Sequence, residues 1–208
     1  VLDPNAVGPV AESLLFRSLP HENVQDLQIS MLPNPASRDA FLETLLGDAG
    51  AGSSGLNRVR VTWHCAGGAA AADAIQVEGI RCSEDGRCAR GRYGRGGYVA
   101  SCAAKANAYA GSEGAGGQRH LFLVLALPEE ELYKGERGQR ASRTVADCPA
   151  HPTEYCFVDE SRLLCVCRLD FHWVPTGRRP KVATAGNHAH AWRAERASSP
   201  QRSPRAYY

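Results

Sequence analysis

Residues 59–109 contain two strand patterns that adjoin runs of glycine, and this segment most constrains how the chain can fold. Its first part reads VRVTWHCAGG and its last part reads GRGGYVASCAAKANAY. Valine and Trp63 alternate with polar residues in the first part, which is typical of a half-buried strand. His64 then lies at the end of that strand, where binding sites are often built. We expect an Ala-rich helix to Glu78 next, then a polar loop and a glycine turn that leads into Tyr98.

The composition is that of an ordinary globular chain. Its 208 residues, 43% hydrophobic and 22% charged, can build one domain with a hydrophobic core. The net charge of +2 does not require a nucleic-acid partner, which stays open. No apolar run reaches the length of about 18 residues that indicates a membrane span, so we expect no membrane association. The chain has neither an initiator Met nor a secretory leader, which is compatible with a fragment or a processed product.

Eight cysteines are present, an even number that would permit a disulfide framework in a small secreted protein. A chain of this length with this many aliphatic residues does not need disulfides for stability. We therefore expect buried, reduced thiols in an intracellular protein, either nuclear or cytoplasmic.

The segment before residue 59 predicts two helices and a strand. A helix is expected near residues 11–19, because Pro20 would end it. Residues 24–32 alternate as a strand does, although the phase of the alternation slips once. A second helix is expected from Ser37, as its N-cap, to Gly47, as its end.

The segment after residue 109 predicts three more strands. Residues 120–127 form a nearly continuous apolar run, which suits a strand covered on both faces. Residues 154–158 and 163–171 are expected to pair as a hairpin. On its second strand, Cys165 and Cys167 are two residues apart and are expected to share a face.

Two stretches lack a periodic pattern. Residues 128–152 are long, charged and irregular, which favours a surface or functional loop. From residue 177 onward Arg, Pro, Ser, Ala and His dominate. We therefore expect one folded domain over residues 1–176 and a basic disordered tail over residues 177–208.

Three residues from separate segments carry side chains that could meet in one site: His64, Tyr98 and Glu154. Each also has a structural explanation. His64 could be a satisfied strand-end residue, Tyr98 a core residue and Glu154 a solvated strand opening. Residue types alone leave these alternatives open.

Six short phrases follow one another in order between residues 24 and 173. They are ISMLPNPASRDAF, WHCAGG, EGIRC, GRGGYVA, KANAY and EYCFV. In this order they resemble the catalytic domain of the poly(ADP-ribose) polymerase family, the diphtheria-toxin-like ADP-ribosyltransferases with a His-Tyr-Glu triad. The glycine-tyrosine phrase GRGGYVA is the most specific part of the resemblance.

The resemblance implies an α+β domain with the ADP-ribosyltransferase fold, a split antiparallel β-sheet core with short flanking helices. It implies a monomer that binds NAD as a substrate between the strands of the triad and transfers ADP-ribose to a protein acceptor. The implied catalytic residues are Glu154, His64 and Tyr98, and the implied NAD-binding residues are His64, Cys65, Arg81, Tyr98 and Tyr109. No metal is implied.

The chemistry of NAD cleavage agrees with these residue types. Breaking the nicotinamide–ribose bond passes through an oxocarbenium-like centre, which a carboxylate such as Glu154 can stabilise. Tyr98 and Tyr109 would hold the nicotinamide ring between them, with aromatic contacts that each add about 0.5–1.5 kcal/mol beyond burial. His64 would hydrogen-bond a ribose hydroxyl and orient the dinucleotide.

The sequence departs from the family pattern at three positions. Cys65 replaces the Gly after the triad His, Ala66 replaces a Ser or Thr, and Ala106 replaces a Ser that binds the carboxamide. Each lost neutral hydrogen bond is worth about 0.5–1.5 kcal/mol. Two such losses would weaken NAD binding about tenfold or more.

The polar loop between Arg81 and Tyr98 carries five arginines: Arg81, Arg87, Arg90, Arg92 and Arg95. The loop is either a solvated surface segment or a cover over the cofactor, where guanidinium groups would bind the pyrophosphate. A Glu in the triad also permits polymer growth, because the carboxylate could activate an incoming hydroxyl as a general base. Mono- and poly-ADP-ribosylation both remain open.

Other classes of function remain as alternatives. The same fold could serve as a weak or inactive module that binds NAD or ADP-ribose, and an RNA 2′-phosphotransferase also uses NAD on a related fold. A zinc site is disfavoured, because the cysteine spacings do not match paired C-x2-C motifs. A cysteine protease using Cys65 or Cys156 with His151 lacks the flanking pattern of a nucleophile at a helix start.

Overall fold

The computed structural model describes residues 4–50, 58–82, 89–110, 117–136 and 143–175. Its helices are α1 (Pro4–Phe16), α2 (Pro35–Gly50), α4 (Ala69–Glu78) and α5 (Ala103–Asn107), with the short 3-10 turns η1 (His21–Asn23) and η2 (Glu160–Arg162). Its strands are β1 (Val24–Met31), β2 (Arg60–Cys65), β3 (Ala89–Gly91), β4 (Gly94–Ala100), β5 (Gly117–Ala126), β6 (Tyr133–Lys134), β7 (Val145–Ala146), β8 (Glu154–Phe157) and β9 (Leu163–Trp173). The chain is therefore an α+β protein.

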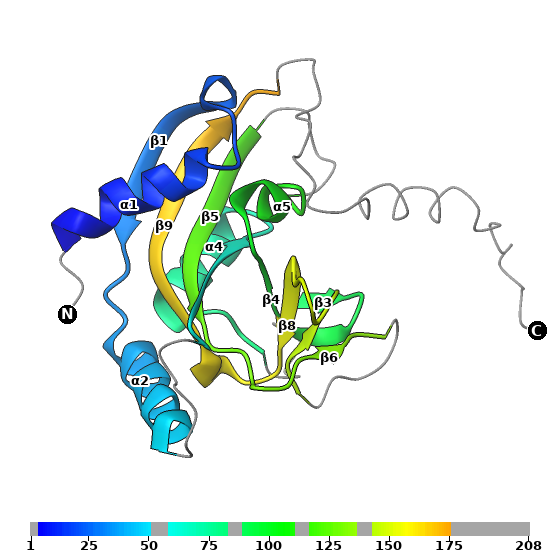
Figure 1. Ribbon diagram of the computed structural model, residues 1–208. Coiled ribbons are helices and arrows are strands. Elements are labelled where there is room, and N and C mark those ends of the chain that lie inside the picture. Colours follow the sequence, from blue (N-terminus) through cyan, green and yellow to red (C-terminus); the bar gives the residue numbers. More distant parts are fainter. Residues whose placement is uncertain (1–3, 51–57, 83–88, 111–116, 137–142, 176–208) are drawn as a thin grey trace, which may run out of the picture. The chain divides into compact units, whose positions relative to one another are not determined.

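The strands form one mostly antiparallel sheet in the order β1-β9-β5-β2-β4-β8-β7-β6, with β3 paired to β4 (Figure 1). Only the edge pair β6–β7 is parallel among the described strands. In the middle of the sheet, β2 and β4 pair at a single position, Trp63 opposite Ala100. We call this position the β2–β4 junction. It separates a first half, β1-β9-β5-β2, from a second half, β3-β4-β8-β7-β6.

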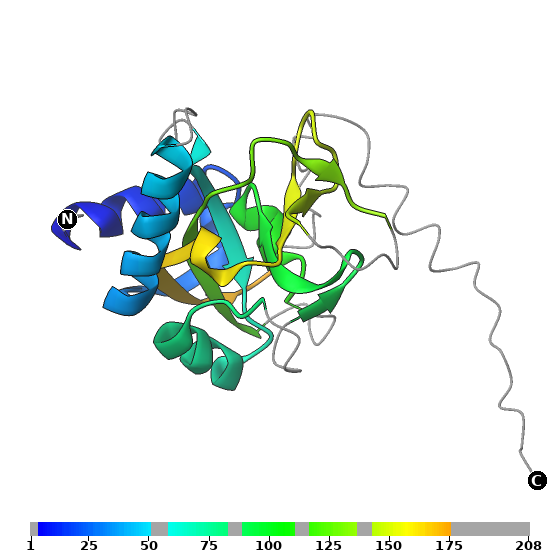
Figure 2. The same ribbon diagram turned by 90° about the horizontal axis from the view of Figure 1, so that it is seen from below.

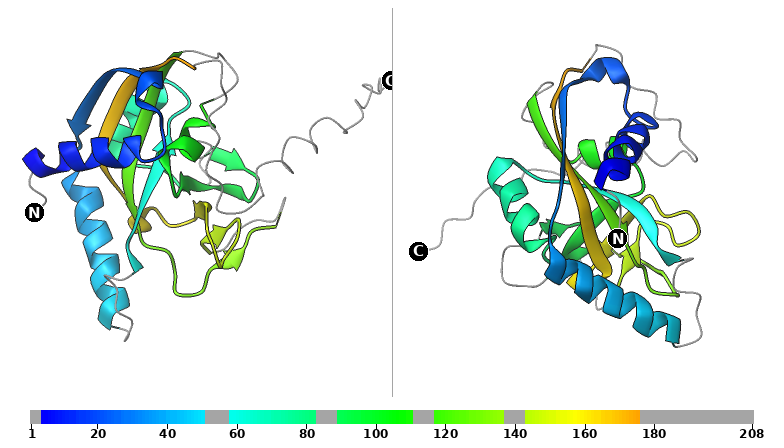
Figure 3. Two further views of the ribbon diagram at one scale, coloured as in Figure 1. Left: turned by 45° about the horizontal axis from the view of Figure 1, so that its top comes forward. Right: turned by 90° about the vertical axis from the view of Figure 1, so that its left-hand side faces the viewer.

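The two faces of the first half are covered by different helices. Val7, Ala11 and Leu15 of α1 pack on one face in a buried cluster with Leu169 and Phe171. Ala72 of α4 belongs to a cluster on the other face with Phe122, Val124, Val99 and Phe157. The right panel of Figure 3 shows α1 and α4 on opposite sides of the sheet. Seen from below, α2 and α4 lie beside the first half and away from β6, β7 and β8 (Figure 2).

The phase slip expected in the first strand is confirmed. The pairing of β1 with β9 shifts register between Gln25 and Gln28. Asp26 adopts a φ of 54° within this interval. Asp tolerates the left-handed region better than most residues, so the sequence accommodates the bulge.

The expected hairpin between residues 154–158 and 163–171 is wrong. The strands β8 and β9 both form, but β8 pairs with β4 and β7, whereas β9 pairs with β5 and β1. The turn η2 instead carries the chain from the second half of the sheet to the first. Short spacing favoured a hairpin, yet apolar strands can also pair with more distant partners that bury them better.

The expectation that Cys165 and Cys167 share a face is also wrong. Cys165 packs in the cluster under α4 and Cys167 in the cluster under α1. The cause is a register shift on β9, where Leu123 pairs with Cys167 and Val124 with Cys165. This bulge at Val166 reverses the side-chain alternation that two-residue spacing would otherwise impose.

The second predicted helix forms but has different ends. It begins at Pro35, and the Asn34 side chain, not that of Ser37, caps it by accepting a hydrogen bond from the Ser37 amide at 3.0 Å. It continues past Gly47 to Gly50. Asp48 in this last turn forms ion pairs with Arg58 and Arg162, both at 3.2 Å, which hold the turn to the domain. The first helix lies earlier than expected and ends at Phe16.

The expected tail over residues 177–208 lies outside the described residues. Within the described ranges, no helix is both long and apolar enough to cross a membrane. The seven cysteines in the described part of the chain are free thiols.

Candidate functional site

Glu154 and Tyr98 lie on the same face of the second half of the sheet. Ala100 pairs with Glu154 and Tyr98 pairs with Cys156 across β4 and β8. Directly opposed residues of an antiparallel pair point to the same side, so Tyr98 and Glu154 are diagonal neighbours. Glu154 is only 8% exposed, although it opens its strand. A buried carboxylate needs partners.

Lys105 of α5 supplies the charged partner of Glu154. Its Nζ lies 3.5 Å from Glu154 Oε2, 3.3 Å from Asp147 Oδ2 and 2.6 Å from the Thr153 hydroxyl. The ammonium is therefore shared between two carboxylates. Asp147 also accepts hydrogen bonds from the amides of Thr153, at 2.8 Å, and Glu154, at 3.0 Å. One carboxylate thus fixes both the lysine and the start of β8.

The pKa of Asp147 reflects these contacts. Burial alone would raise the pKa, but hydrogen bonds from the Thr153 hydroxyl and amide, the charge of Lys105 and the Glu154 amide outweigh it and lower the pKa below its usual value. Because folding lowers this pKa, the stabilisation is complete above the pKa of the unfolded chain, about 3.9, and is lost as the pH falls through the folded value.

We therefore expect Asp147→Asn to lower the free energy of unfolding by about 1.5–3 kcal/mol at pH 7, the range for hydrogen bonds to charged groups. The difference from the wild type should shrink when urea unfolding is repeated below pH 4. Asp39→Asn is the control, because the Asp39 side chain is 62% exposed. A difference that stays constant from pH 7 to pH 2.5 would contradict a role for the charge.

Three tyrosines lie close enough to Glu154 for its charge to affect their pKa values. Burial raises the pKa of Tyr109, and the charge of Glu154 and a side-chain hydrogen bond to it raise the pKa further. Burial also raises the pKa of Tyr98, with Cys156 and then Glu154 adding to it. Burial and the Glu154 charge raise the pKa of Tyr93 to about 12. All three phenols are therefore neutral near pH 7. Tyr109 is 48% exposed, so its ring has a free surface for a ligand.

The Tyr98 hydroxyl is occupied by the β3–β4 turn. It donates to the Gly94 carbonyl at 2.8 Å and accepts from the Tyr93 amide at 2.9 Å. A Cβ at Gly91 would lie 2.5 Å from Cζ of Tyr98, so glycine is required there for the ring to pack against the backbone. Tyr98 can therefore offer a ligand its ring but not its hydroxyl.

His64 meets this group at the β2–β4 junction. Its Nδ1 lies 2.7 Å from the Tyr98 carbonyl oxygen, which can only accept, so Nδ1 is the donor. Burial lowers the pKa of His64, and the bond to Tyr98 opposes this effect only in part. The neutral ring then presents Nε2 as an acceptor, and within the described part of the chain Nε2 makes no hydrogen bond.

The three triad candidates do not share one face of the sheet. His64 pairs with Phe122, and the ring centroids of this pair are 6.4 Å apart, so His64 lies on the face under α4. The side chains of Tyr98 and Glu154 lie on the opposite face. A ligand that touches all three must cross the sheet at the β2–β4 junction.

Two further NAD-binding candidates lie outside the group around Glu154. Arg81 pairs with Glu160 at 3.1 Å and with Glu78 at 3.2 Å. Its guanidinium is thus held by two carboxylates. The Cys65 thiol lies against the cluster under α1, and burial raises its pKa to about 11 despite the opposing charge of Arg119. This thiol is therefore protonated and not a nucleophile near neutral pH.

Ala66 and Ala106, the positions without a hydroxyl, are 5% and 1% exposed and belong to different core clusters. Ala66 directly follows β2, and Ala106 lies in α5, the helix that follows β4. No hydroxyl is available from either position.

Sequence reasoning missed Lys105, Asp147 and Tyr93. Lys105 lies four residues before Tyr109, a spacing that places both on one side of a helical turn and could have indicated a shared site. Asp147 lies in the long irregular segment, where no periodicity predicts its direction. Tyr93 could only be placed once the β3–β4 turn was known.

No protein-family model matches the chain, and no curated protein is significantly similar to it. The class of site is therefore defined by geometry. It combines a buried, lysine-paired carboxylate and a half-exposed tyrosine with, on the other face, an imidazole whose Nε2 makes no hydrogen bond to the described residues. Such a set can orient hydroxyl groups and stabilise a developing positive charge.

Proposed function

We propose that the chain is an NAD-dependent ADP-ribosyltransferase with the ADP-ribosyltransferase fold, and that it transfers ADP-ribose to a protein acceptor. The observation that carries the proposal is the placement of Glu154. Its side chain is 11% exposed, is paired with Lys105 and lies close enough to Tyr109 to contribute to the raised pKa of that phenol. A split, mostly antiparallel sheet with short helices supports the fold part of the proposal.

In the proposed reaction the bond between nicotinamide and C1′ of its ribose breaks, and nicotinamide leaves with the bonding electron pair. A nucleophilic atom of the acceptor forms the new bond to C1′. Its proton passes to the Glu154 carboxylate, which also stabilises the positive charge that develops on the ribose. The positive charge of the NAD pyridinium ring makes nicotinamide a good leaving group, so no metal is needed for this step.

The other residues bind and orient. Tyr109 offers a half-exposed ring to the nicotinamide, with the ring of Tyr98 as the second surface. His64 Nε2 accepts a hydrogen bond from a ribose hydroxyl. Lys105 holds the Glu154 carboxylate in place, because the ammonium is itself fixed by Asp147.

The test is incubation of the purified chain with NAD labelled on its adenylate half. We expect release of nicotinamide and appearance of the label on protein. The length of the attached product separates single transfer from polymer growth. Wild-type protein that binds NAD yet releases no nicotinamide with any acceptor fraction would refute the proposed transfer.

A second candidate is a binding module of the same fold with little or no turnover. It is favoured by Ala66 and Ala106, which supply no hydroxyl to a carboxamide or ribose. It is also favoured by Arg81, which is paired with two carboxylates. This candidate predicts tight ADP-ribose binding without nicotinamide release, the reverse of the result expected for the enzyme.

A further inference from the structure

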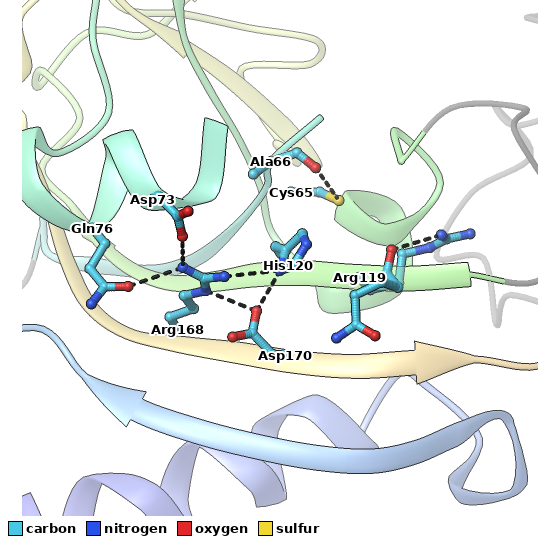
Figure 4. Close-up of polar contacts among 9 residues, drawn as sticks. Cys65, Ala66, Asp73, Gln76, Arg119, His120, Arg168 and Asp170 are labelled. Atoms are coloured by element: carbon cyan, nitrogen blue, oxygen red, sulfur yellow. Dashed lines mark hydrogen bonds and ion pairs between the residues drawn. The ribbon is translucent and has the colours of Figure 1, made fainter. Parts of the chain in front are cut away.

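A polar cluster on the face under α4 is paired within itself. Arg168 donates to Asp170 at 2.9 Å, and Asp170 also lies 2.6 Å from Nδ1 of His120. Arg168 joins this pair to α4 through hydrogen bonds to Asp73, at 2.7 Å, and Gln76, at 3.0 Å. Figure 4 shows the guanidinium between the helix and the two strands. The charged groups of this cluster are therefore used within the protein, where they hold α4 to the sheet.

The Tyr93 side chain, by contrast, is buried with a hydroxyl that has no partner among the described residues. Tyr93 lies in the turn between β3 and β4 and is 2% exposed. Its backbone amide donates to the Tyr98 hydroxyl, but within the described part of the chain no hydrogen bond is made by its own hydroxyl. The hydroxyl oxygen is not a fully buried atom. Since polar groups of buried side chains almost always have partners, this hydroxyl is open to a bound molecule.

Contacts on both sides fix the Tyr93 ring. It stacks on the Tyr98 ring, with the centroids 6.4 Å apart and the two planes inclined by 14°. A Cβ at Gly135 would overlap the Tyr93 ring, so the backbone of Gly135 packs directly against it. Cζ of Arg92 lies 5.7 Å from the ring centroid. The hydroxyl therefore has a fixed position, and a ligand can bind it without ordering a mobile side chain.

Tyr93 lies on the same face and in the same half of the sheet as Glu154. Its ring belongs to a buried cluster with Val145 and Cys156. Val145 pairs with Cys156 and Cys156 with Tyr98, so these three side chains form one row across β7, β8 and β4. The next row on this face contains Glu154, two residues along β8 from Cys156. Two such rows are about 7 Å apart, a spacing that one tyrosine side chain can span.

The charges around Glu154 act on the Tyr93 hydroxyl. Burial raises the pKa of Tyr93 to about 12, with a further increase from Glu154, an opposing effect of Arg92 and a smaller increase from Asp147. After burial and Glu154, Tyr93 also contributes to the raised pKa of Tyr109. Such effects weaken with distance, so the Tyr93 oxygen lies at the end of the ring that faces Glu154 and Tyr109. The phenol keeps its proton near neutral pH and can donate it to a hydrogen bond.

We propose that Tyr93 is a substrate-binding residue of this site and donates a hydrogen bond to a hydroxyl of the nicotinamide ribose of NAD. The assignment rests on the proposed function, because it takes the ligand to be NAD. A group between Glu154 and Tyr93 must donate to a carboxylate and accept from a phenol, and a single hydroxyl does both. The bond that breaks lies at C1′ of this ribose, so its hydroxyls are the ones nearest to Glu154.

The test uses Tyr93→Phe, which removes the hydroxyl and keeps the ring. The matched control is Tyr133→Phe, because the Tyr133 hydroxyl is bonded to Glu131 and Arg143 on an exposed part of the chain. The first probe is carba-NAD, in which a methylene replaces the ring oxygen of the nicotinamide ribose so that the bond to nicotinamide stays intact. The other probes are the two forms of carba-NAD that lack the 2′- or the 3′-hydroxyl of that ring. Calorimetric titration gives the dissociation constants, and thermal unfolding checks the fold.

We expect Tyr93→Phe to weaken carba-NAD binding roughly 3- to 10-fold, the cost of one hydrogen bond, and Tyr133→Phe to bind as the wild type does. The deoxy form that lacks the contacted hydroxyl should bind equally to Tyr93→Phe and to the wild type. The melting temperature of Tyr93→Phe should not fall, because the lost hydroxyl has no hydrogen-bond partner among the described residues.

Equal binding of carba-NAD by the wild type and Tyr93→Phe overturns the inference and leaves the proposed transfer standing. The same loss with all three probes, or a lower melting temperature, also overturns it, because the hydroxyl would then support the fold and not the ribose. Binding that depends on the Tyr93 hydroxyl, without nicotinamide release from NAD by the wild type, supports the inference and refutes the transfer. A wild type that binds neither carba-NAD nor NAD overturns both.

Discussion

Glu154→Gln should reduce nicotinamide release and label transfer by about 10³-fold, the largest effect of any single substitution on activity. Glutamine keeps the size and shape of the side chain but can neither take a proton nor stabilise a cationic ribose. Removing a general base or an electrostatic stabiliser typically costs 10²- to 10⁴-fold in rate. The measurement is single-turnover nicotinamide release at saturating NAD.

The fold of this variant should survive. Lys105 keeps Asp147 as a partner at 3.3 Å, so no buried ammonium is left without a carboxylate. ADP-ribose binding should change little, because the contacts of His64 are untouched. Glu12→Gln on the exposed side of α1 is the matched control and should retain full activity. Undiminished turnover by Glu154→Gln would remove Glu154 from the chemistry.

Phe122→Ala should produce the largest loss of stability, about 3–5 kcal/mol in the free energy of unfolding. The Phe122 side chain is fully buried in the cluster under α4 and lies next to the His64 ring. Its removal leaves a cavity between the sheet and the cluster under α4, which can close only if the helix shifts towards the sheet. The free energy of unfolding of a typical domain is about 5–15 kcal/mol, so this substitution removes a large part of it. Urea unfolding monitored by tryptophan fluorescence measures the change.

Leu46→Ala is the matched control, because Leu46 is 70% exposed on α2. Its free energy of unfolding should stay within about 0.5 kcal/mol of the wild type. Phe122→Leu should recover most of the loss, since it refills much of the volume. A loss below 1 kcal/mol for Phe122→Ala would show that the cluster under α4 does not support the sheet.

Local signals predicted most elements of the fold but not how they pair. The alternation of apolar and polar residues identified the strand at 24–32 and the slip in its phase. The continuous apolar run at 120–127 identified a central strand, because a strand buried on both faces has an apolar residue at nearly every position. The pairing of β8 depends on β4, which lies more than fifty residues earlier in the chain, and no local pattern encodes such a partner. The bulge at Val166 could not be predicted from the sequence either, because it arises from the pairing register between β9 and β5.

The candidate site shows the same division. The segments that carry His64, Tyr98 and Glu154 could be selected from motifs, and the structure brings the last two to one face beside Tyr109. The motifs could not show that His64 lies on the other face of the sheet. The face on which a side chain lies depends on the pairing register of its strand, here of β2 with β4 and β5. The sharing of Lys105 between Asp147 and Glu154 requires a loop to return to α5, which only tertiary structure specifies.

The β2–β4 junction also has a consequence for how the chain is made. Successive strands pass from one half of the sheet to the other at the β2–β3, β4–β5, β5–β6 and β8–β9 connections. Neither half is a contiguous piece of chain. Among the described strands, β1 pairs only with β9. During synthesis β1 therefore stays unpaired until nearly all of the domain has been translated. Until then the exposed apolar edges of β5 and β1 need protection, so synthesis should depend on chaperones more than refolding of the finished chain at low concentration does.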